Sequence, residues 1–213
     1  MANNSEQVSW HPEAIATAAE AALTGLRNVS LLDGFYLAGG TALALRYGHR
    51  LSRDLDFFAS QAFDEERLLL GMRELSGFSL AARAPQTLHA IVQETKVSFL
   101  GYPYPVLFPP APYREVAVAD PRDIACMKIS AIASRGARRD FVDLYVAAQR
   151  FGLAELLGLF ERKYAQTRYS KLHILKSLTF FEDAEKEPIP HLLVPLDWDE
   201  LKRFFLRDVP RPA

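Results

Sequence analysis

Two aspartates separated by one residue, Asp54 and Asp56, are the first candidates for chemistry in this sequence. Residues 53–59 alternate and then become apolar, which predicts a β-strand whose single face carries both carboxylates. Carboxylates so close repel each other, and a hard divalent cation with oxygen ligands removes that repulsion. Mg²⁺ commonly takes one or two protein carboxylates and fills its shell with phosphate oxygens and water. Arg50 and Arg53 flank the pair and could neutralise further anionic charge.

A second candidate lies upstream, where Gly39, Gly40 and Thr41 follow the short apolar run 35–38. The run predicts a strand that ends at the glycines, and a helix follows it. Glycine lets the backbone approach a ligand closely, and a helix N-terminus offers N–H groups and partial positive charge to phosphate. The 13 residues between Gly40 and Asp54 fit a two-turn helix and a return loop. One element can therefore hold a polyphosphate while the next holds its metal.

The order strand, Gly-Gly-Thr, helix and Asp-x-Asp strand resembles the first motif of the AbiEii/AbiGii toxin family of nucleotidyltransferases. The residues that carry the resemblance read GGTALAL and HRLSRDLDFF. That family belongs to the polymerase-β-like nucleotidyltransferase superfamily. The resemblance implies that Gly40 and Thr41 contact a triphosphate and that Asp54 and Asp56 bind Mg²⁺, as one or two ions. It also implies that Ser52 braces the loop before the Asp-x-Asp strand.

A lysine stands on an apolar helical stripe further along the chain. On a helix, Lys128 shares a stripe with Ile124, Ile132 and Arg135. A buried ammonium group is costly without an anionic partner, and a phosphate or the Asp-x-Asp carboxylates would supply one. Alternatively, the lysine reaches water from the edge of the stripe. The spacing alone leaves both interpretations open.

Two aspartates, Asp140 and Asp143, follow one turn apart on the next predicted helix. The spacing by itself favours a surface helix with an ion pair between Arg139 and Asp143. The same order of Lys, Arg and Arg-Asp-x-x-Asp-Leu-Tyr is found in the AbiEii-like family. This resemblance implies that Lys128 contacts triphosphate oxygens, and that Asp140 or Asp143 orients or deprotonates the acceptor hydroxyl or holds the site together. The nucleotide-binding residues implied in total are Gly39, Gly40, Thr41, Ser52, Arg53, Arg135 and Arg139, of which Arg135 and Arg139 could instead pair with the helix acids.

The sequence departs from the superfamily at one position. Many members place a third carboxylate on a later strand, where residues 96–99 of this chain carry Ser98. Glu94 is nearby but precedes the expected strand. Either a helix acid replaces the missing carboxylate, or the acceptor needs little deprotonation, or catalysis has been lost.

The elements that must position these residues divide the chain into an α/β part, 1–119, and a helical part, 120–213, which could still share one core. The predicted fold is a mixed α/β sheet with flanking helices, followed by an α-helical part. Asp120 and Pro121 mark the start of the helical part. The predicted helices are 17–26, 41–47, 64–75, 124–134, 138–150, 153–164, 170–178 and 197–206. The predicted strands are 35–38, 53–59, 78–84, 88–93, 96–102 and 114–118, with an irregular or edge segment at 103–112 and a loop at 182–195.

Composition excludes several classes of protein. Apolar residues make up 49% of the 213 residues, so a core of normal size can form. A net charge of −1 argues against a basic nucleic-acid coat or a membrane-surface protein. The lone Cys126 forbids an internal disulfide, and no stretch approaches the ~20 apolar residues of a membrane helix. The start of the chain lacks the features of a signal peptide, so we expect a cytoplasmic protein without membrane contact.

The sequence therefore predicts a Mg²⁺-dependent nucleotidyltransferase that moves a nucleoside monophosphate from a nucleoside triphosphate to a hydroxyl of tRNA or protein. The resemblance alone implies a toxin with an antitoxin protein as partner. Ser98 motivates an alternative, a binding module that kept the fold and lost catalysis. A phosphohydrolase using the same aspartates is a third possibility.

Overall fold

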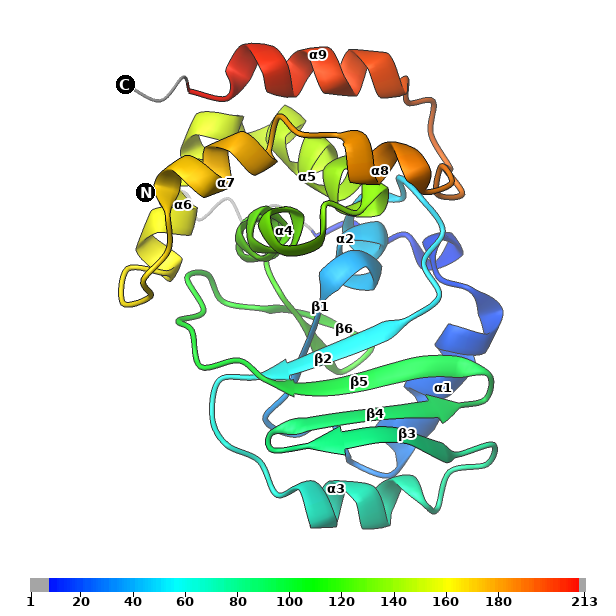
Figure 1. Ribbon diagram of the computed structural model, residues 1–213. Coiled ribbons are helices and arrows are strands. Elements are labelled where there is room, and N and C mark those ends of the chain that lie inside the picture. The colour runs from blue at the N-terminus through cyan, green and yellow to red at the C-terminus, as the bar shows by residue number, and fades with distance from the viewer. Residues whose placement is uncertain (1–7, 211–213) are drawn as a thin grey trace, which may run out of the picture.

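A computed structural model of the protein describes residues 8–210. The interpretation of the first ten residues as lacking a signal peptide thus falls mostly outside the described residues. Within that range, a mixed β-sheet forms the lower half of the molecule and most of the helices form the upper half (Figure 1). None of the helices between residues 8 and 210 is long and apolar enough to cross a membrane.

The sheet has seven strands in the described chain, in the order β3-β4-β5-β2-β1-β7-β6. The β2–β5 and β1–β7 pairs are parallel, and the other neighbours are antiparallel. The strands are β1 (Tyr36–Ala38), β2 (Leu55–Ala59), β3 (Ser79–Ala84), β4 (Thr87–Val92), β5 (Thr95–Gly101), β6 (Ala111–Tyr113) and β7 (Val116–Val118). This mixed sheet with flanking helices confirms the predicted fold class.

One face of the sheet is buried against helices, as β4 shows. Along β4, Leu88, Ala90 and Val92 are fully buried, whereas the residues between them are half-buried. They join the apolar faces of α1 (Thr17–Asn28) and α3 (Glu65–Met72) in one buried cluster. The intervening positions of β4, β5 and β2 remain available to face a ligand.

Helix α2 (Gly39–Tyr47) connects β1 to β2 and lies between the sheet and the helical part (Figure 1). It begins two residues before the predicted start at Thr41, because the glycines already belong to its first turn. It ends at Gly48, whose φ of 61° is the left-handed conformation that glycine adopts most easily.

The helical part has its own apolar cluster, which runs from Ala125 to Val209. Asp120 caps its first helix, because the carboxylate accepts the N–H of Arg122 at 2.9 Å and Pro121 is the first helical residue. The helices are α4 (Pro121–Arg135), α5 (Arg138–Phe151), α6 (Leu153–Lys163), α7 (Lys171–Ser177), α8 (Glu182–Lys186) and α9 (Trp198–Asp208), and a short 3₁₀ helix, Pro12–Ala14, precedes α1.

One sequence prediction about the elements was wrong. The expected loop 182–195 contains α8, a helix too short to show a clear apolar period. The expected strand 114–118 begins only at Val116, because Arg114 and Glu115 have φ of 45° and 68° and form the turn of the β6–β7 hairpin. The other predicted helices and strands exist with shifted ends, and the proline-rich segment 103–112 leads into β6, an edge strand.

Candidate active site

The turn from β1 into α2 brings the glycines against the Asp-x-Asp strand. Gly39 has φ of 66°, and a β-carbon there would lie 3.1 Å from Oδ2 of Asp56. Ala38 is the register partner of Asp56 in the β1–β2 pair. The carboxylate of Asp56 therefore lies beside the glycine turn, as the order of motifs predicts.

A pair of hydroxyls holds the loop before β2 in place. Thr41 is 2% exposed, and its hydroxyl donates to the carbonyl oxygen of Asp54. Its Oγ1 also lies 2.7 Å from Oγ of Ser52, which is buried. The hydroxyl of Thr41 is thus engaged within the protein, so a nucleotide would meet the backbone N–H of this residue. β2 begins at Leu55, directly after the carbonyl that Thr41 holds, rather than at Arg53.

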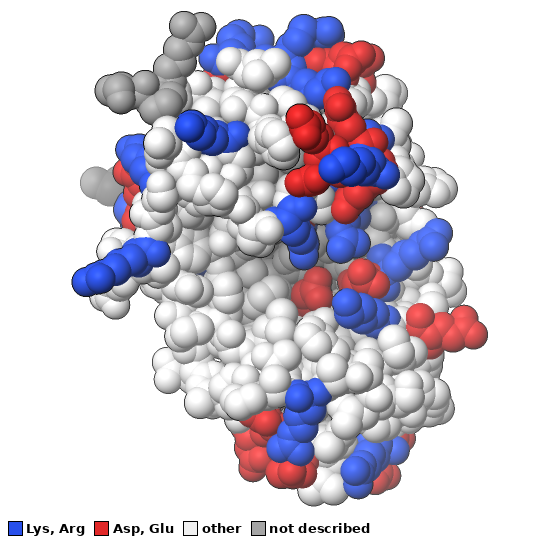
Figure 2. Space-filling view, in the orientation of Figure 1, with Lys and Arg blue, Asp and Glu red and all other residues white. Residues whose placement is uncertain are grey.

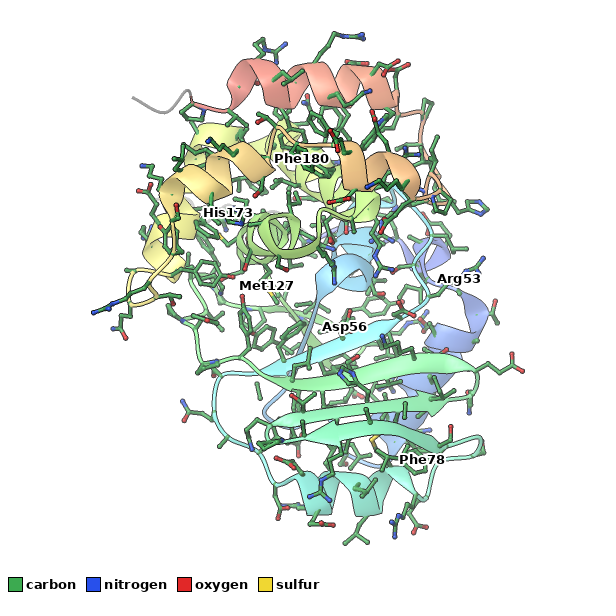
Figure 3. The ribbon with its side chains drawn as sticks, viewed as in Figure 1. Arg53, Asp56, Phe78, Met127, His173 and Phe180 are labelled. Carbon is green, nitrogen blue, oxygen red and sulfur yellow. The ribbon has the colours of Figure 1, made fainter. Side chains whose placement is uncertain are left out.

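A cavity of about 890 Å³ opens between the sheet and α4. Its floor includes Asp56 of β2 and its roof includes Met127 of α4, which lie on the two sides of this space (Figure 3). Figure 2 shows acidic side chains in the hollow of this face, with basic side chains around them. The predicted site residues that line the cavity are Gly39, Gly40, Thr41, Ser52, Arg53, Asp54, Asp56, Lys128, Arg135 and Arg139.

The two carboxylates suit a hard divalent cation. Asp54 and Asp56 are half-buried, line the same cavity and present only oxygen ligands. Among the described residues, no group of three or more His, Cys, Asp or Glu side chains is placed to hold a metal ion. The protein would therefore supply two carboxylate ligands. This number suits Mg²⁺, because the ion usually completes its coordination shell with phosphate oxygens and water.

The predicted helix acids lie beneath the cavity wall rather than in it. Asp140 and Asp143 are fully buried and do not line the cavity. Lys128 is 5% exposed, and its ammonium lies 2.7 Å from a carboxylate oxygen of each. The sequence interpretation of α5 as a surface helix with an Arg139–Asp143 pair was therefore wrong, because Asp143 is fully buried and pairs with Lys128 and Arg50. The partners of Lys128 are these two acids, not the Asp-x-Asp carboxylates.

Asp140 is held by two cations of α4. Besides Lys128, Nε of Arg135 donates to its Oδ2 at 2.7 Å and Nη2 of Arg135 donates to its Oδ1 at 3.0 Å. Burial raises the pKa of the Asp140 carboxyl, but the charges of Lys128 and Arg135 outweigh burial and hold this pKa below its ordinary value. The ionised Asp140 carboxylate therefore holds Lys128 and Arg135 in place, and both of these residues line the cavity.

Asp143 is held by the loop between α2 and β2. Nε and Nη2 of Arg50 donate to its two oxygens at 2.7 and 2.8 Å, and Nε2 of His49 donates to Oδ1 at 2.8 Å. Burial raises the pKa of Asp143, but Arg50, Lys128 and the hydrogen bonds bring it well below its ordinary value. Five side chains thus form one buried ionic network: His49, Arg50, Lys128, Asp140 and Asp143.

The network explains why residue 40 is glycine. A β-carbon on Gly40 would lie 2.1 Å from Nη2 of Arg50 and 3.4 Å from Oδ2 of Asp143. Any side chain there would displace the guanidinium group from its carboxylate. The missing side chain at residue 40 thus makes room for Arg50, a role that the sequence analysis did not predict.

We expect the free energy of unfolding to fall in two steps as pH decreases. Burial lowers the pKa of His49, and among the described residues its Nδ1 is buried with no hydrogen-bond partner. The unfolded chain binds more protons than the folded protein below the ordinary pKa of histidine, about 6.5, and again below that of Asp, about 3.9. Stability is therefore complete near pH 7, declines first through His49, and declines further as Asp140 and Asp143 are protonated.

Urea unfolding at pH 7, 5.5 and 3.5 measures these steps. The His49→Gln variant should lose the decline between pH 7 and 5.5 and keep the lower one. An unchanged upper decline in this variant would show that another group causes it.

Several residues around the cavity were not identified from the sequence as site residues. His89 of β4 and Lys96 of β5 contribute to its floor, and the segment 187–191 forms one wall. The alternation of β4 places His89 on the face opposite to Leu88, which was a usable signal. The segment 187–191 gave no such signal in the sequence, because its position depends on backbone pairing of residues 49–51 with 191–193.

Glu94, considered as a replacement acid, lies in the exposed β4–β5 turn outside the cavity lining.

The chain was compared with known protein families and structures. Residues 21–105 and 98–213 match the family described as Nucleotidyl transferase AbiEii toxin, Type IV TA system. An uncharacterized protein of Aquifex aeolicus (strain VF5) is 39% identical over 194 residues, which cover 88% of this chain and 92% of that protein.

Two solved structures share the fold. MenT4, a nucleotidyltransferase toxin from Mycobacterium tuberculosis H37Rv, is 18% identical with a TM-score of 0.54, covering 91% of this chain and 85% of MenT4. The antibiotic-resistance factor ANT(2'')-Ia is 13% identical with a TM-score of 0.51, covering 70% of this chain and 94% of its own. Together with the family match over most of the sequence, these findings show that the chain belongs to the AbiEii nucleotidyl transferase toxin family and is a nucleotidyltransferase.

Proposed function

We propose that the protein transfers a nucleoside monophosphate from a Mg²⁺-bound nucleoside triphosphate to a hydroxyl group of tRNA or protein. The observation that carries this proposal is the placement of Asp54 and Asp56 in one cavity with the glycine turn at the start of α2. The cavity volume of about 890 Å³ lies within the range of small-molecule sites, which is roughly 300–1,000 Å³. This space accommodates a nucleotide and leaves an open side for an acceptor.

The helix start and the basic residues of the cavity bind the triphosphate. The first N–H groups of α2 have no partner within the helix, and Gly39 and Gly40 place them at the cavity. Arg53, Lys96 and Arg139 also line it and are in no ion pair within residues 8–210, so their charge is available to phosphate oxygens. Lys128 has three donors, of which two are taken by Asp140 and Asp143. The third can reach a phosphate oxygen.

The carboxylates of Asp54 and Asp56 would hold the metal. Mg²⁺ bound there supplies neutralising charge at the attacking and leaving oxygens. Asp140 and Asp143 act as positioning residues, since they fix Lys128, Arg135 and Arg50 from behind the cavity wall. This assignment leaves neither helix acid free to take a proton from the acceptor.

We further propose that the reaction serves as the toxin activity of a toxin–antitoxin pair. The family match and the likeness to MenT4, a nucleotidyltransferase toxin, support this role. A tRNA end or a serine, threonine or tyrosine hydroxyl offers the oxygen nucleophile that the chemistry needs. An antitoxin protein would then be the partner that prevents the transfer.

The proposal predicts that the purified protein labels an acceptor when supplied with Mg²⁺ and α-labelled nucleoside triphosphates. Each of the four ribonucleotides is incubated separately with total RNA and with cell protein, and the label is resolved on denaturing gels. EDTA should abolish the labelling, and excess Mg²⁺ should restore it. Label released as free nucleotide without any acceptor product would instead favour a phosphohydrolase, and nucleotide binding without turnover would favour a binding module.

A further inference from the structure

The strand register places a histidine in line with Asp56, one of the two carboxylates proposed to hold the metal. Asp56 of β2 is the register partner of Ser98 on β5, and Ser98 is the register partner of His89 on β4. Side chains of register partners share a face of the sheet, and neighbouring strands are about 4.8 Å apart. Asp56, Ser98 and His89 therefore form a row across three strands, and all three line the cavity.

A hydrogen bond fixes the orientation of this histidine. Nδ1 of His89 lies 3.0 Å from Oγ of Ser98, and the Ser98 side chain is 2% exposed. When Nδ1 carries the proton and donates it to Ser98, the lone pair is on Nε2. His89 is half-buried and lines the cavity, so Nε2 is the nitrogen left to meet a reactant.

The other candidates for a proton acceptor are already engaged or badly placed. Asp54 and Asp56 are assigned to the metal, and Asp140 and Asp143 are buried in ion pairs outside the cavity lining. Glu187 lies at the rim, where its Oε2 accepts the backbone N–H of Arg138 at 2.9 Å.

His191 also lies at the rim, as an exposed residue. Of the histidines that line the described cavity, His89 lies on the sheet floor with Asp56, and histidine is the side chain that most often accepts a proton in catalysis.

We propose that His89 is the catalytic base of the transfer and that Ser98 is its positioning residue; this inference rests on the proposed function. The acceptor oxygen forms a bond to the α-phosphorus as its proton passes to Nε2 of His89. The bond between the α-phosphorus and the bridging oxygen breaks, and pyrophosphate leaves with that electron pair. The imidazolium of His89 then returns its proton to water.

Both acidic and basic groups surround the imidazole of His89. Asp56 faces it from β2, beyond Ser98, and Lys96 lines the same floor two residues before Ser98 on β5. The residue opposite His89 on β3 is Ala82, which carries no charge. Arg53 and Asp54 also line the cavity, from the loop before β2.

The test compares His89→Gln with wild-type protein, using the α-labelled nucleotide and total RNA or cell protein, whichever the wild-type protein labels. General-base catalysis is worth about 100-fold to 10,000-fold, so we expect kcat to fall by at least about 100-fold with KM for the nucleotide unchanged. Added imidazole should restore part of the rate of His89→Ala, because the smaller alanine leaves room for imidazole at the site. Ser98→Ala should lose up to about tenfold and Ser98→Thr, which keeps the hydroxyl, should recover it.

The exposed histidine of α7 provides the matched control, because His173→Gln makes the same change outside this cavity. A His89→Gln enzyme as fast as wild type would overturn this inference alone. The inference would also be overturned if His89→Ala lost activity, bound nucleotide normally by calorimetry and gained no rate from added imidazole. If the wild-type protein binds nucleotide but labels no acceptor, the proposed function fails, and this inference fails with it.

Discussion

Replacement of Asp56 with asparagine is expected to slow nucleotide transfer by about 1000-fold or more and to leave the fold intact. Asp56 is half-buried beside Gly39 and lines the cavity, so its carboxylate faces the reactants rather than the core. The amide keeps the shape of the side chain but removes one negative charge from the pair that would hold Mg²⁺. Loss of several kcal/mol of transition-state stabilisation corresponds to this factor, because each ~1.4 kcal/mol is tenfold in rate.

Initial rates of label transfer, measured over a range of Mg²⁺ concentrations, test the effect of Asp56→Asn. Asp199→Asn is the matched control, since the Asp199 side chain is 70% exposed on α9 and lies outside the cavity lining. Thermal unfolding of both variants separates a lost metal site from a lost fold. Transfer by Asp56→Asn within tenfold of the wild-type rate, at every Mg²⁺ concentration, would remove Asp56 from the metal site.

The largest effect on stability is expected at Asp143. The Asp143→Asn variant should lose about 3–5 kcal/mol of unfolding free energy, because Arg50 remains buried without its counter-charge and Lys128 keeps only Asp140. Arg50 has a side-chain exposure of 6% and donates two hydrogen bonds to this carboxylate, so water cannot replace the lost partner.

Urea unfolding near pH 7 measures this loss, with Asp140→Asn as the informative comparison. Asp140 shares Lys128 but also pairs with Arg135, whose side chain is 52% exposed and can turn to water. The Asp140 variant should therefore be destabilised less than the Asp143 variant. Equal losses, or a loss below about 1 kcal/mol at Asp143, would contradict the proposed importance of the Arg50–Asp143 pair.

The parts of the site that depend on local sequence could be predicted. A strand, a glycine turn, a helix and a second strand follow one another within residues 35–59, so short-range periodicity was enough to bring Asp56 to Gly39. The cap at Asp120 and the break at Gly136 were also visible, because each depends on residues within one helical turn.

The parts that depend on distant partners could not be predicted. Asp143 contacts Arg50 and His49 across separations of 93 and 94 residues, and nothing near Asp143 in the sequence indicates that α5 is covered on that side. The spacing therefore suggested a surface pair with Arg139. The position of His89 next to Ser98 depends on the pairing register of two strands, which a single sequence does not fix.

The ionic network also bears on how this chain could be divided. Arg50 and His49 belong to the α/β part, whereas Lys128, Asp140 and Asp143 belong to the helical part. A fragment ending near residue 119 would carry the Arg50 guanidinium and the His49 donor without the anion that they bind, and the complementary fragment would carry two carboxylates with only Lys128 and Arg135 to balance them. An unrelated helical module in place of the C-terminal half would therefore leave Arg50 without its counter-charge, unless it supplied a carboxylate at the same place.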